Sequence, residues 1–519
     1  MNAAVHRHAP PPNAPAPLDL LGTRFFEAAL VGDAVHTRGS VDCRFGHRLD
    51  RGPGQPDDGI FAEWRWDGET LTVTNDRYGM YPLFYCAGRE AVRVSPSIAT
   101  LVRAGAPAEL DHEALAIFLR LGFFLGDDTP FARIKALPPN ARLVWRRGEL
   151  ALDGGRVVTR PADLTREAAI EGYVELFRQS IRRRLPENED FAVPLSGGRD
   201  SRHILLELCE QGRRPKLCVT TKPYRPRTDE DVRVASLVTA ALALPHAILD
   251  QPDRFDAEHR KNVATSFCSD EHTWALVLAE FLRGRAATLF DGIGGDVLSA
   301  GLFLRRQRLA LYEAGRFAEL ADLILPPLNE RTLSLVLRPG VRAVATRSRA
   351  VHRIAVELER HAEAPNPIGS FYFWNRTRRE INLVPYALLS SVGTVFAPYL
   401  DHDLYDFLAA LPLALVRDGE LHTDVIRHAY PKVRDVPFED KAVPRVDVWM
   451  ARRQFLRQLV EYAGTSAGAP PSLTRAARPL LACASAAHRF FDVRPYVDPE
   501  LVLYLLQLEK LAAGGEDGA

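Results

Sequence analysis

The chain has 519 residues, more than one hydrophobic core usually serves, so about two or three domains are expected. Hydrophobic residues make up 46% and charged residues 25%, as in an ordinary globular protein, and 66 basic residues balance 66 acidic ones. The zero net charge and the lack of an apolar run of roughly 18–20 residues argue against nucleic-acid and membrane partners, so neither is expected.

The two ends and the cysteines of the chain predict a cytoplasmic protein. Residues 8–19 are rich in proline and contain no hydrophobic signal core, so residues 1–19 and 511–519 are predicted to be disordered tails. None of the six cysteines belongs to a Cys-x-x-Cys pair, which argues against a zinc site or a dense disulfide framework. Scattered reduced cysteines are typical of the cytoplasm.

The first part of the chain reads as short strands separated by turns. Residues 70–74 alternate between apolar and polar side chains, as a half-buried strand does, and residues 83–85 and 141–145 are apolar strands next to turns. Residues 113–121 predict a helix. We therefore expect a β-rich domain over residues 20–155.

Strands and helices alternate after residue 160. A helix is predicted from residue 170 to residue 181, and further helices over residues 229–242 and 274–282. The predicted strands lie at residues 191–195, 217–220 and 287–290. This alternation indicates a parallel, doubly wound sheet whose site lies at the carboxyl ends of the strands, and beyond about residue 300 the pattern is mostly helical.

The most informative motif is Ser-Gly-Gly-Arg-Asp-Ser at residues 196–201, between a predicted strand and a predicted helix. A glycine turn at the start of a helix presents free N–H groups and, here, two hydroxyls to an anion. The motif lacks the Gly-Lys-Ser/Thr ending of a Walker loop. It matches the SGGxDS loop of the ATP pyrophosphatases, and the structural alternative is a turn that only caps the helix.

Further segments carry carboxylates or a lysine at the ends of predicted strands and helices: 228–230 (Thr-Asp-Glu), 269–272 (Ser-Asp-Glu-His), 291–296 (Asp-Gly-Ile-Gly-Gly-Asp), 397–402 (Ala-Pro-Tyr-Leu-Asp-His) and 438–444 around Lys441. In this order they resemble the asparagine synthetase B family, which has a DE pair, a DEP-like segment, SGEGxDE, PFLDH and a lysine after its SGGxDS loop. Residues 58–62, 75–85 and 129–139 resemble the second half of the glutaminase domain of that family.

The resemblance implies an α/β fold in two parts. Residues 20–155 would form a class II glutamine amidotransferase-like domain with the αββα layers of Ntn hydrolases. Residues 160–510 would form an ATP pyrophosphatase domain with a doubly wound parallel sheet and a helical C-terminal region. The implied cofactors are ATP and Mg²⁺, and the implied partner is a small molecule or peptide that carries a carboxylate or an amine. A homodimer is left open.

The resemblance also implies roles for individual residues. Asp200 and Asp296 would ligate Mg²⁺, and Lys441 would stabilise the oxyanion and the α-phosphate during amine attack. The structural alternatives are a helix cap for Asp200, a turn carboxylate for Asp296 and a surface position for Lys441. The nucleotide would be bound by Ser196, Gly197, Gly198, Asp200, Ser201, Val219, Thr220, Gly294 and Gly295. Thr221 would line the adenine and ribose pocket beside Val219 and Thr220, and the alternative for these three is simple strand packing.

The sequence departs from the family pattern at the residues that supply ammonia. The glutaminase of the family uses a cysteine directly after Met1, where this sequence has Asn2, and its first cysteine is Cys43. Ile293 stands where the family has a glutamate that assists ammonia, and Thr394 stands where the family often has another glutamate. We therefore expect a degenerate glutaminase domain that hydrolyses no glutamine.

The expected function is an AMP-forming ligase that adenylates a carboxylate for attack by an amine of the same substrate. Relatives without a working glutaminase, the β-lactam synthetases and lasso-peptide cyclases, follow this logic. One alternative is an asparagine synthetase that uses free ammonia, which Ile293 disfavours. The other is a nucleotide-binding scaffold without catalysis.

Several other charged residues and one histidine also have roles that the sequence suggests. Arg199 and Arg202 are expected either to add charge to a phosphate site or to lie in solvent. Asp270 and Glu271 are expected to help hold the acceptor or metal, and His272 beside them is expected to be structural. Asp401 is expected to anchor the start of a helix.

Overall fold

The computed structural model describes residues 24–186, 190–224, 228–327, 329–439, 452–465, 472–475, 477–488, 493 and 496–514. Residues 1–19, predicted to be a tail, lie outside this set. The second predicted tail begins within helix α20 (Pro499–Ala512), so the helix continues further than the sequence suggested, and residues 515–519 lie outside the described residues.

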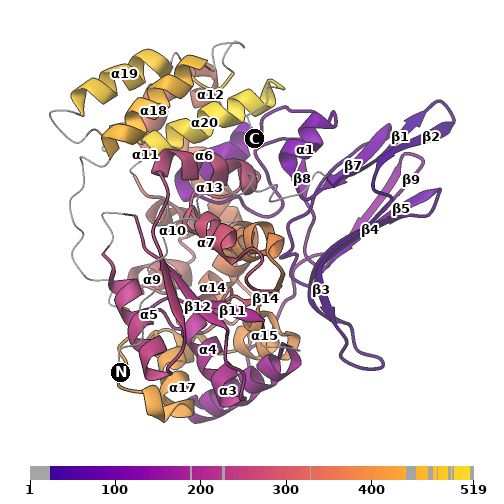
Figure 1. Cartoon of the computed structure of the whole chain (residues 1–519). Helices are drawn as coiled ribbons and strands as arrows, with labels where there is room; N and C mark the ends of the chain where they lie inside the picture. Colours follow the sequence, from indigo (N-terminus) through magenta and orange to yellow (C-terminus); the bar gives the residue numbers. More distant parts are fainter. Residues whose placement is uncertain are drawn as a thin grey trace.

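The front domain consists of two antiparallel five-stranded sheets, which project from the helical body (Figure 1). Along the first sheet the strands are β2 (Ala34–Gly39), β1 (Phe26–Val31), β7 (Ala91–Ser95), β6 (Phe84–Ala87) and β8 (Lys135–Ala136). Along the second they are β10 (Glu149–Asp153), β9 (Arg142–Arg146), β5 (Thr70–Asn75), β4 (Asp58–Trp66) and β3 (Asp42–Leu49). The strands predicted at residues 70–74, 83–85 and 141–145 are confirmed as β5, β6 and β9.

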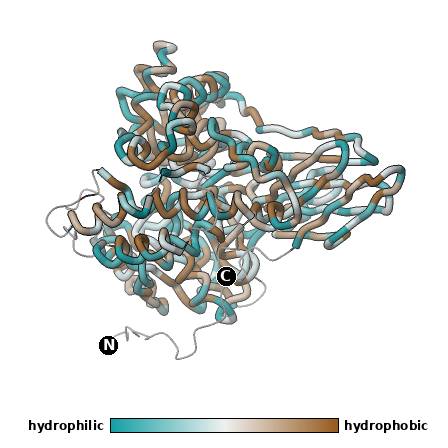
Figure 2. The backbone as a smooth tube through the Cα atoms, turned by 90° about the horizontal axis from the view of Figure 1, so that it is seen from above, coloured by the Kyte–Doolittle hydropathy of each residue, from teal (hydrophilic) through white to brown (hydrophobic). Residues whose placement is uncertain are grey.

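Alternating polarity explains how these sheets form a core. In β5, Leu71 and Val73 are buried, whereas the threonines that alternate with them, Thr70, Thr72 and Thr74, are half-buried. Seen from above, the strands of the front domain carry hydrophilic and hydrophobic residues in succession (Figure 2). Helices α1 (Ile98–Arg103) and α2 (His112–Leu121) lie in the connection between β7 and β8, and α2 confirms the helix predicted there.

The second part of the chain contains the predicted parallel sheet, with strand order β13-β12-β11-β14-β15 and only parallel pairs. The predicted strands are β11 (Phe191–Pro194), β12 (Leu217–Thr221) and β14 (Thr288–Phe290). The sequence did not reveal β13 (His246–Leu249) or β15 (Thr394–Phe396). The chain runs outward from β11 to β13 on one side and from β14 to β15 on the other, so the order reverses between β11 and β14.

Helices surround this sheet. Helix α4 (Asp200–Glu210) packs against β11, and both α5 (Glu230–Ala241) and α7 (Trp274–Leu282) pack against β12. The other described helices between residues 166 and 372 are α3 (Arg166–Arg183), α6 (Arg254–Ala264), α8 (Gly295–Ser299), α9 (Arg306–Glu313), α10 (Phe317–Ile324), α11 (Asn329–Val336), α12 (Pro339–Val344), α13 (Arg347–Glu359) and α14 (Pro367–Tyr372).

The C-terminal part is helical, as expected. A π-helical stretch comprises η1 (Phe373–Ile381) and η2 (Val384–Leu388), a rare geometry that is frequent at functional sites. The segments that follow are η3 (Leu389–Ser391), η4 (Pro398–Leu400), α15 (His402–Ala409), α16 (Leu413–Val416), α17 (Leu421–Ala429), η5 (Pro431–Val433), α18 (Arg452–Thr465), α19 (Ala477–Ala487) and α20. Among the described residues, no helix is both long and apolar enough to span a bilayer.

A buried set of ion pairs joins the front domain to the second part. Arg184, 2% exposed, contacts Asp58 of β4 at 3.0 Å and Asp401 at 2.7 Å. Asp401 also accepts N–H bonds from Asp403 and Leu404 at the start of α15, which confirms its predicted role as a helix anchor. Because a buried charge that loses its partners is costly, these pairs fix the two parts against each other.

Candidate active site

Two glycine turns meet at the point where the strand order reverses. Residues 195–199 connect β11 to α4, and residues 291–294 connect β14 to α8. Strands β11 and β14 are adjacent and parallel, so both turns lie at the same edge of the sheet. In doubly wound sheets, ligands bind in the crevice outside this edge, at the reversal of strand order.

The first turn is organised around its N–H groups and hydroxyls. The Ser196 N–H donates to Ser201 Oγ at 3.0 Å, and the two serine hydroxyl oxygens are 3.1 Å apart. The Gly198 N–H donates to Ser196 Oγ at 3.2 Å. The Gly197 N–H donates to the Asp231 carboxylate of α5 at 2.6 Å, so the turn already binds an anionic oxygen.

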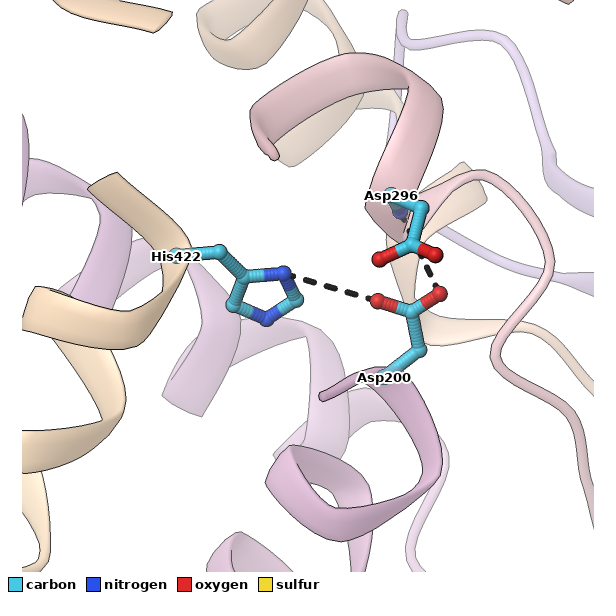
Figure 3. A group of neighbouring side chains, drawn as sticks. All are labelled: Asp200, Asp296 and His422. Carbon is cyan, nitrogen blue, oxygen red and sulfur yellow. Dashed lines mark hydrogen bonds and ion pairs between the residues drawn. The ribbon is translucent and has the colours of Figure 1, made fainter. Parts of the chain in front are cut away.

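Asp200 and Asp296 lie next to each other beside this turn, with His422 on the far side of Asp200 (Figure 3). The Asp296 N–H donates to Asp200 Oδ2 at 3.2 Å, and His422 Nδ1 lies 3.4 Å from Asp200 Oδ1. Asp200 is the first residue of α4, and the capping residue of that helix is Arg199. The Asp200 carboxylate therefore does not cap α4 but accepts the N–H of Asp296.

Their electrostatics fit a divalent cation. Burial, and then the neighbouring charge of Asp296, raise the pKa of Asp200 well above its usual range. Burial lowers the pKa of His422 to about 3, so this ring is neutral at pH 7 and offers no compensating charge. One ligand atom from each of the three side chains lies within 4.8 Å of the others. Carboxylates are the protein ligands that Mg²⁺ prefers.

Glycines in the second turn make room for Asp200. A Cβ at Gly292 would lie 2.6 Å from the Asp200 Cβ, and a Cβ at Gly295 would lie 2.4 Å from Asp200 Oδ1. Gly294 has a φ of +95°, in the left-handed region that favours glycine. The predicted Gly295 is therefore required by the position of Asp200, and the predicted Gly294 by its own backbone conformation.

A cavity of about 660 Å³ opens beside both turns. Ser196, Asp200, Ser201, Val219 and Asp296 line it, as the predicted nucleotide site requires. Thr220, Gly197, Gly198 and Gly295 are not among the lining residues, so their part in nucleotide binding stays a prediction.

Alternation along β12 explains why Thr220 does not line the cavity. The Thr220 hydroxyl is buried, donates to the Leu195 carbonyl at 2.7 Å and lies 2.8 Å from His246 Nε2. Successive side chains of a strand point to opposite faces, so Val219 and Thr221, both predicted to line the nucleotide pocket, face the cavity while Thr220 points away from it.

Lys441 lies outside the described residues, but the segment before it is anchored at the first turn. The Glu439 N–H donates to the Gly197 carbonyl at 3.0 Å. The prediction that Lys441 acts in this site therefore stays a prediction.

Both expectations for Arg202 are wrong. It is 2% exposed and donates to the carbonyls of Val436 at 3.0 Å and Pro437 at 2.6 Å, so it contacts neither solvent nor an open phosphate site. Arg199 donates from Nε to Thr423 Oγ1 at 2.7 Å. The two arginines thus hold the C-terminal segments against α4.

Three lining or adjacent residues at the other end of the cavity were not predicted to matter there. His272 lies in the loop before α7, and Arg376 and Glu380 lie in η1. The sequence alone does not reveal this grouping, because Glu380 comes close to Asp270 and Glu271 only where η1 meets this loop.

Comparisons with known proteins agree with the two-part architecture. Residues 55–154 match the model of the glutamine amidotransferase domain, and residues 172–437, half of the chain, match the model of asparagine synthase. No curated protein gives a match.

Among solved structures, one titled as the allosteric regulatory enzyme of purine biosynthesis is 12% identical, with a TM-score of 0.15. The alignment covers 38% of this chain and 48% of that chain, so it spans about half of that protein. The family assignment rests on the asparagine synthase model, which matches half of the chain. The chain belongs to the asparagine synthase family.

Proposed function

We propose that the protein is an AMP-forming ligase that adenylates a carboxylate and joins it to an amine, without glutaminase activity. The observation that carries this proposal is the pairing of Asp200 and Asp296 beside the Ser196–Ser201 turn, within one cavity of about 660 Å³. A scaffold that merely binds nucleotide has no need of two half-buried carboxylates side by side.

The residues of the site divide the work of adenylation. The N–H groups of Gly197 and Gly198 and the hydroxyls of Ser196 and Ser201 would bind the pyrophosphate part of ATP. Asp200 and Asp296 would hold Mg²⁺, which when bound neutralises charge on the departing pyrophosphate. The substrate carboxylate attacks the α-phosphorus and pyrophosphate leaves. The amine then attacks the acyl carbon, and AMP leaves with the electron pair of the broken C–O bond.

Two observations support an amine other than ammonia from glutamine. Among residues 24–153, Cys43 and Cys86 are both buried, and burial raises the pKa of the Cys86 thiol, so neither is suited to act as a nucleophile. Ile293 lines the cavity with an aliphatic side chain that accepts no proton. We infer that the amine belongs to an organic substrate, as in the β-lactam synthetase and lasso-peptide cyclase branch, and that the reaction closes a ring.

The test is ATP–pyrophosphate exchange with labelled pyrophosphate and pools of amino acids, carboxylated metabolites and peptides. Asp200→Asn removes the charge at nearly constant shape, and Asp33→Asn makes the same change at an exposed turn of the front domain. Exchange that depends on one pool, is lost in Asp200→Asn and survives in Asp33→Asn supports adenylation. ATP binding without exchange in any pool would favour the scaffold, and exchange with aspartate followed by ammonia-dependent asparagine formation would favour the synthetase.

A further inference from the structure

The loop before α7 and the π-helical segment η1 meet at the same cavity and form its acidic end. His272 in this loop has a φ of +82°, which is uncommon for a residue with a side chain. It is 6% exposed and lines the cavity, yet neither of its ring nitrogens has a hydrogen-bond partner. Strained residues and unsatisfied buried polar groups are both rare and cluster at functional sites.

Acidic groups surround this imidazole. Glu380 is 1% exposed, and its Oε1 lies 4.0 Å from His272 Nε2. Burial, and then the charge of Asp270, raise the pKa of Glu380 well above its usual range, and the charge of Glu271 adds to this. One ligand atom each from Glu271, His272 and Glu380 lies within 4.8 Å of the others.

One guanidinium partly balances these charges. Arg376 contacts Glu271 at 3.3 Å and Glu380 at 3.2 Å. Burial, with the charges of Arg376 and Lys261, lowers the pKa of His272 to about 3, so the imidazole is neutral at pH 7 and can accept a hydrogen bond. Lys261, whose charge also acts on this imidazole, is paired with Glu258 at 3.3 Å. The carboxyl groups of Asp270, Glu271 and Glu380 therefore outnumber the remaining cation, Arg376, and leave acceptor oxygens for one more.

The cavity that this acidic end shares with the Asp200–Asp296 pair also has apolar lining residues, which include Ile293, Leu302, Ile381 and Val384 and form its apolar wall. A ligand with a charged head in the acidic end and an aliphatic stem along this wall would therefore reach toward the adenylation site. Free ammonium would leave the wall uncovered.

We propose that the subsite formed by Glu271, His272 and Glu380 binds a primary ammonium group carried on an apolar stem, and that this group is the amine substrate. The inference rests on the proposed function and names the class of its second substrate. An ammonium group has three N–H donors, and the subsite offers an acceptor atom on each of its three side chains within 4.8 Å of one another. A divalent metal fits less well, because the Arg376 guanidinium already contacts both carboxylates.

Isothermal titration of the full-length protein with n-pentylammonium chloride, in the absence of ATP, tests the subsite. The neutral analogue n-pentanol and the ions Mg²⁺ and Zn²⁺ are titrated separately. Glu271→Gln is the main variant because the Glu271 side chain is 53% exposed and its change should leave folding intact. His272→Asn is the second, since asparagine tolerates positive φ. Glu171→Gln, at an exposed position of α3, is the matched control.

We expect n-pentylammonium to bind the wild type and the Glu171→Gln control equally, and about 10-fold more weakly to each subsite variant, with no binding of n-pentanol; loss of one charged hydrogen bond corresponds to a factor of this order. Equal binding to all variants, no binding to the wild type, or binding of Zn²⁺ or Mg²⁺ that depends on Glu271 in place of the amine would overturn the proposal. Because no ATP is present, amine binding without pyrophosphate exchange would contradict the proposed function alone. Exchange without amine binding would contradict this inference alone.

Discussion

The Arg202 side chain donates from Nη2 to the Pro437 carbonyl at 2.6 Å, and this bond ties α4 to the segment that leads to Lys441. Burial, with the charge of Arg199, lowers the pKa of Arg202 to about 10, so the guanidinium stays charged at pH 7. The Phe438 ring lies 4.1 Å from the guanidinium carbon and covers it. Helix α4 thus supports the segment that precedes the predicted catalytic lysine.

Replacing Arg202 by methionine should release this segment. We expect a loss of on the order of 2 kcal/mol in the free energy of unfolding, because hydrogen bonds from a charged buried donor are lost. Urea denaturation gives the stability, and the KM for ATP in the exchange assay should rise. Arg306→Met, at an exposed position of α9, is the control, and equal stability of the two variants would contradict the anchoring role.

Replacing Gly295 by alanine should displace the Asp200 carboxylate, since the new Cβ would lie 2.4 Å from Oδ1. We expect the exchange rate to fall about 100-fold, as displacements near 1 Å in a catalytic site commonly cause. Gly340→Ala is the matched control, because a Cβ there meets nothing within 4 Å. An unchanged exchange rate in Gly295→Ala would show that the position of Asp200 is not critical.

Glu357 should make stability depend on pH in the acidic range. Burial alone would raise its pKa, but hydrogen bonds with His361 and Asn375 and the charge of Arg360 outweigh this and lower it to about 2. A carboxyl group whose pKa is depressed in the folded state stabilises above its unfolded value of 4.5, and this contribution is lost as the pH falls toward 2. The difference corresponds to about 3 kcal/mol.

The corresponding measurement is urea unfolding of the wild type and Glu357→Gln at several acidic pH values. The wild type should lose stability relative to the variant as the pH falls from 4.5 to 2. The same pH profile for both proteins would exclude Glu357 as the cause. Glu171→Gln again controls for the loss of a carboxylate.

Glutamine should not serve as a nitrogen source. We expect the wild type to release no glutamate from glutamine, and Cys43→Ala to leave the exchange rate unchanged, because the buried Cys43 is no nucleophile. Quantification of glutamate by chromatography checks the first point. Glutamate formation that requires Cys43 would restore a glutaminase function to the front domain.

The parts of the fold that the sequence predicts depend on local patterns. The alternation in β5 and the glycine turns after β11 and β14 can be recognised in short windows of sequence. The rule that parallel strands carry ligands at their carboxyl ends then brings Asp200 and Asp296 together without any knowledge of long-range contacts. Strand β15 escapes prediction because only three residues form it and its pairing partner is distant in sequence.

The parts that the sequence does not predict depend on register and on distant contacts. Thr221 lines the cavity and Thr220 does not, and this is decided by the register of β12 against β11 and β13. His272 gains its interest only because η1 places Glu380 beside it, and π-helical geometry has no strong signal in sequence. The sequence does not predict the burial of Arg202 for the same reason, since the carbonyls that it binds belong to a segment far along the chain.

The bond between the Gly197 N–H and the Asp231 carboxylate has a consequence for the binding of ATP. A phosphate oxygen that takes this N–H must first displace a carboxylate that belongs to the protein itself. In the proposed function, nucleotide entry would therefore exchange one anion for another at this N–H, and the Asp231 side chain would have to move as the nucleotide arrives. The chain would act as a competitor of its own substrate, and the affinity of this turn for ATP would be the difference between two occupied states.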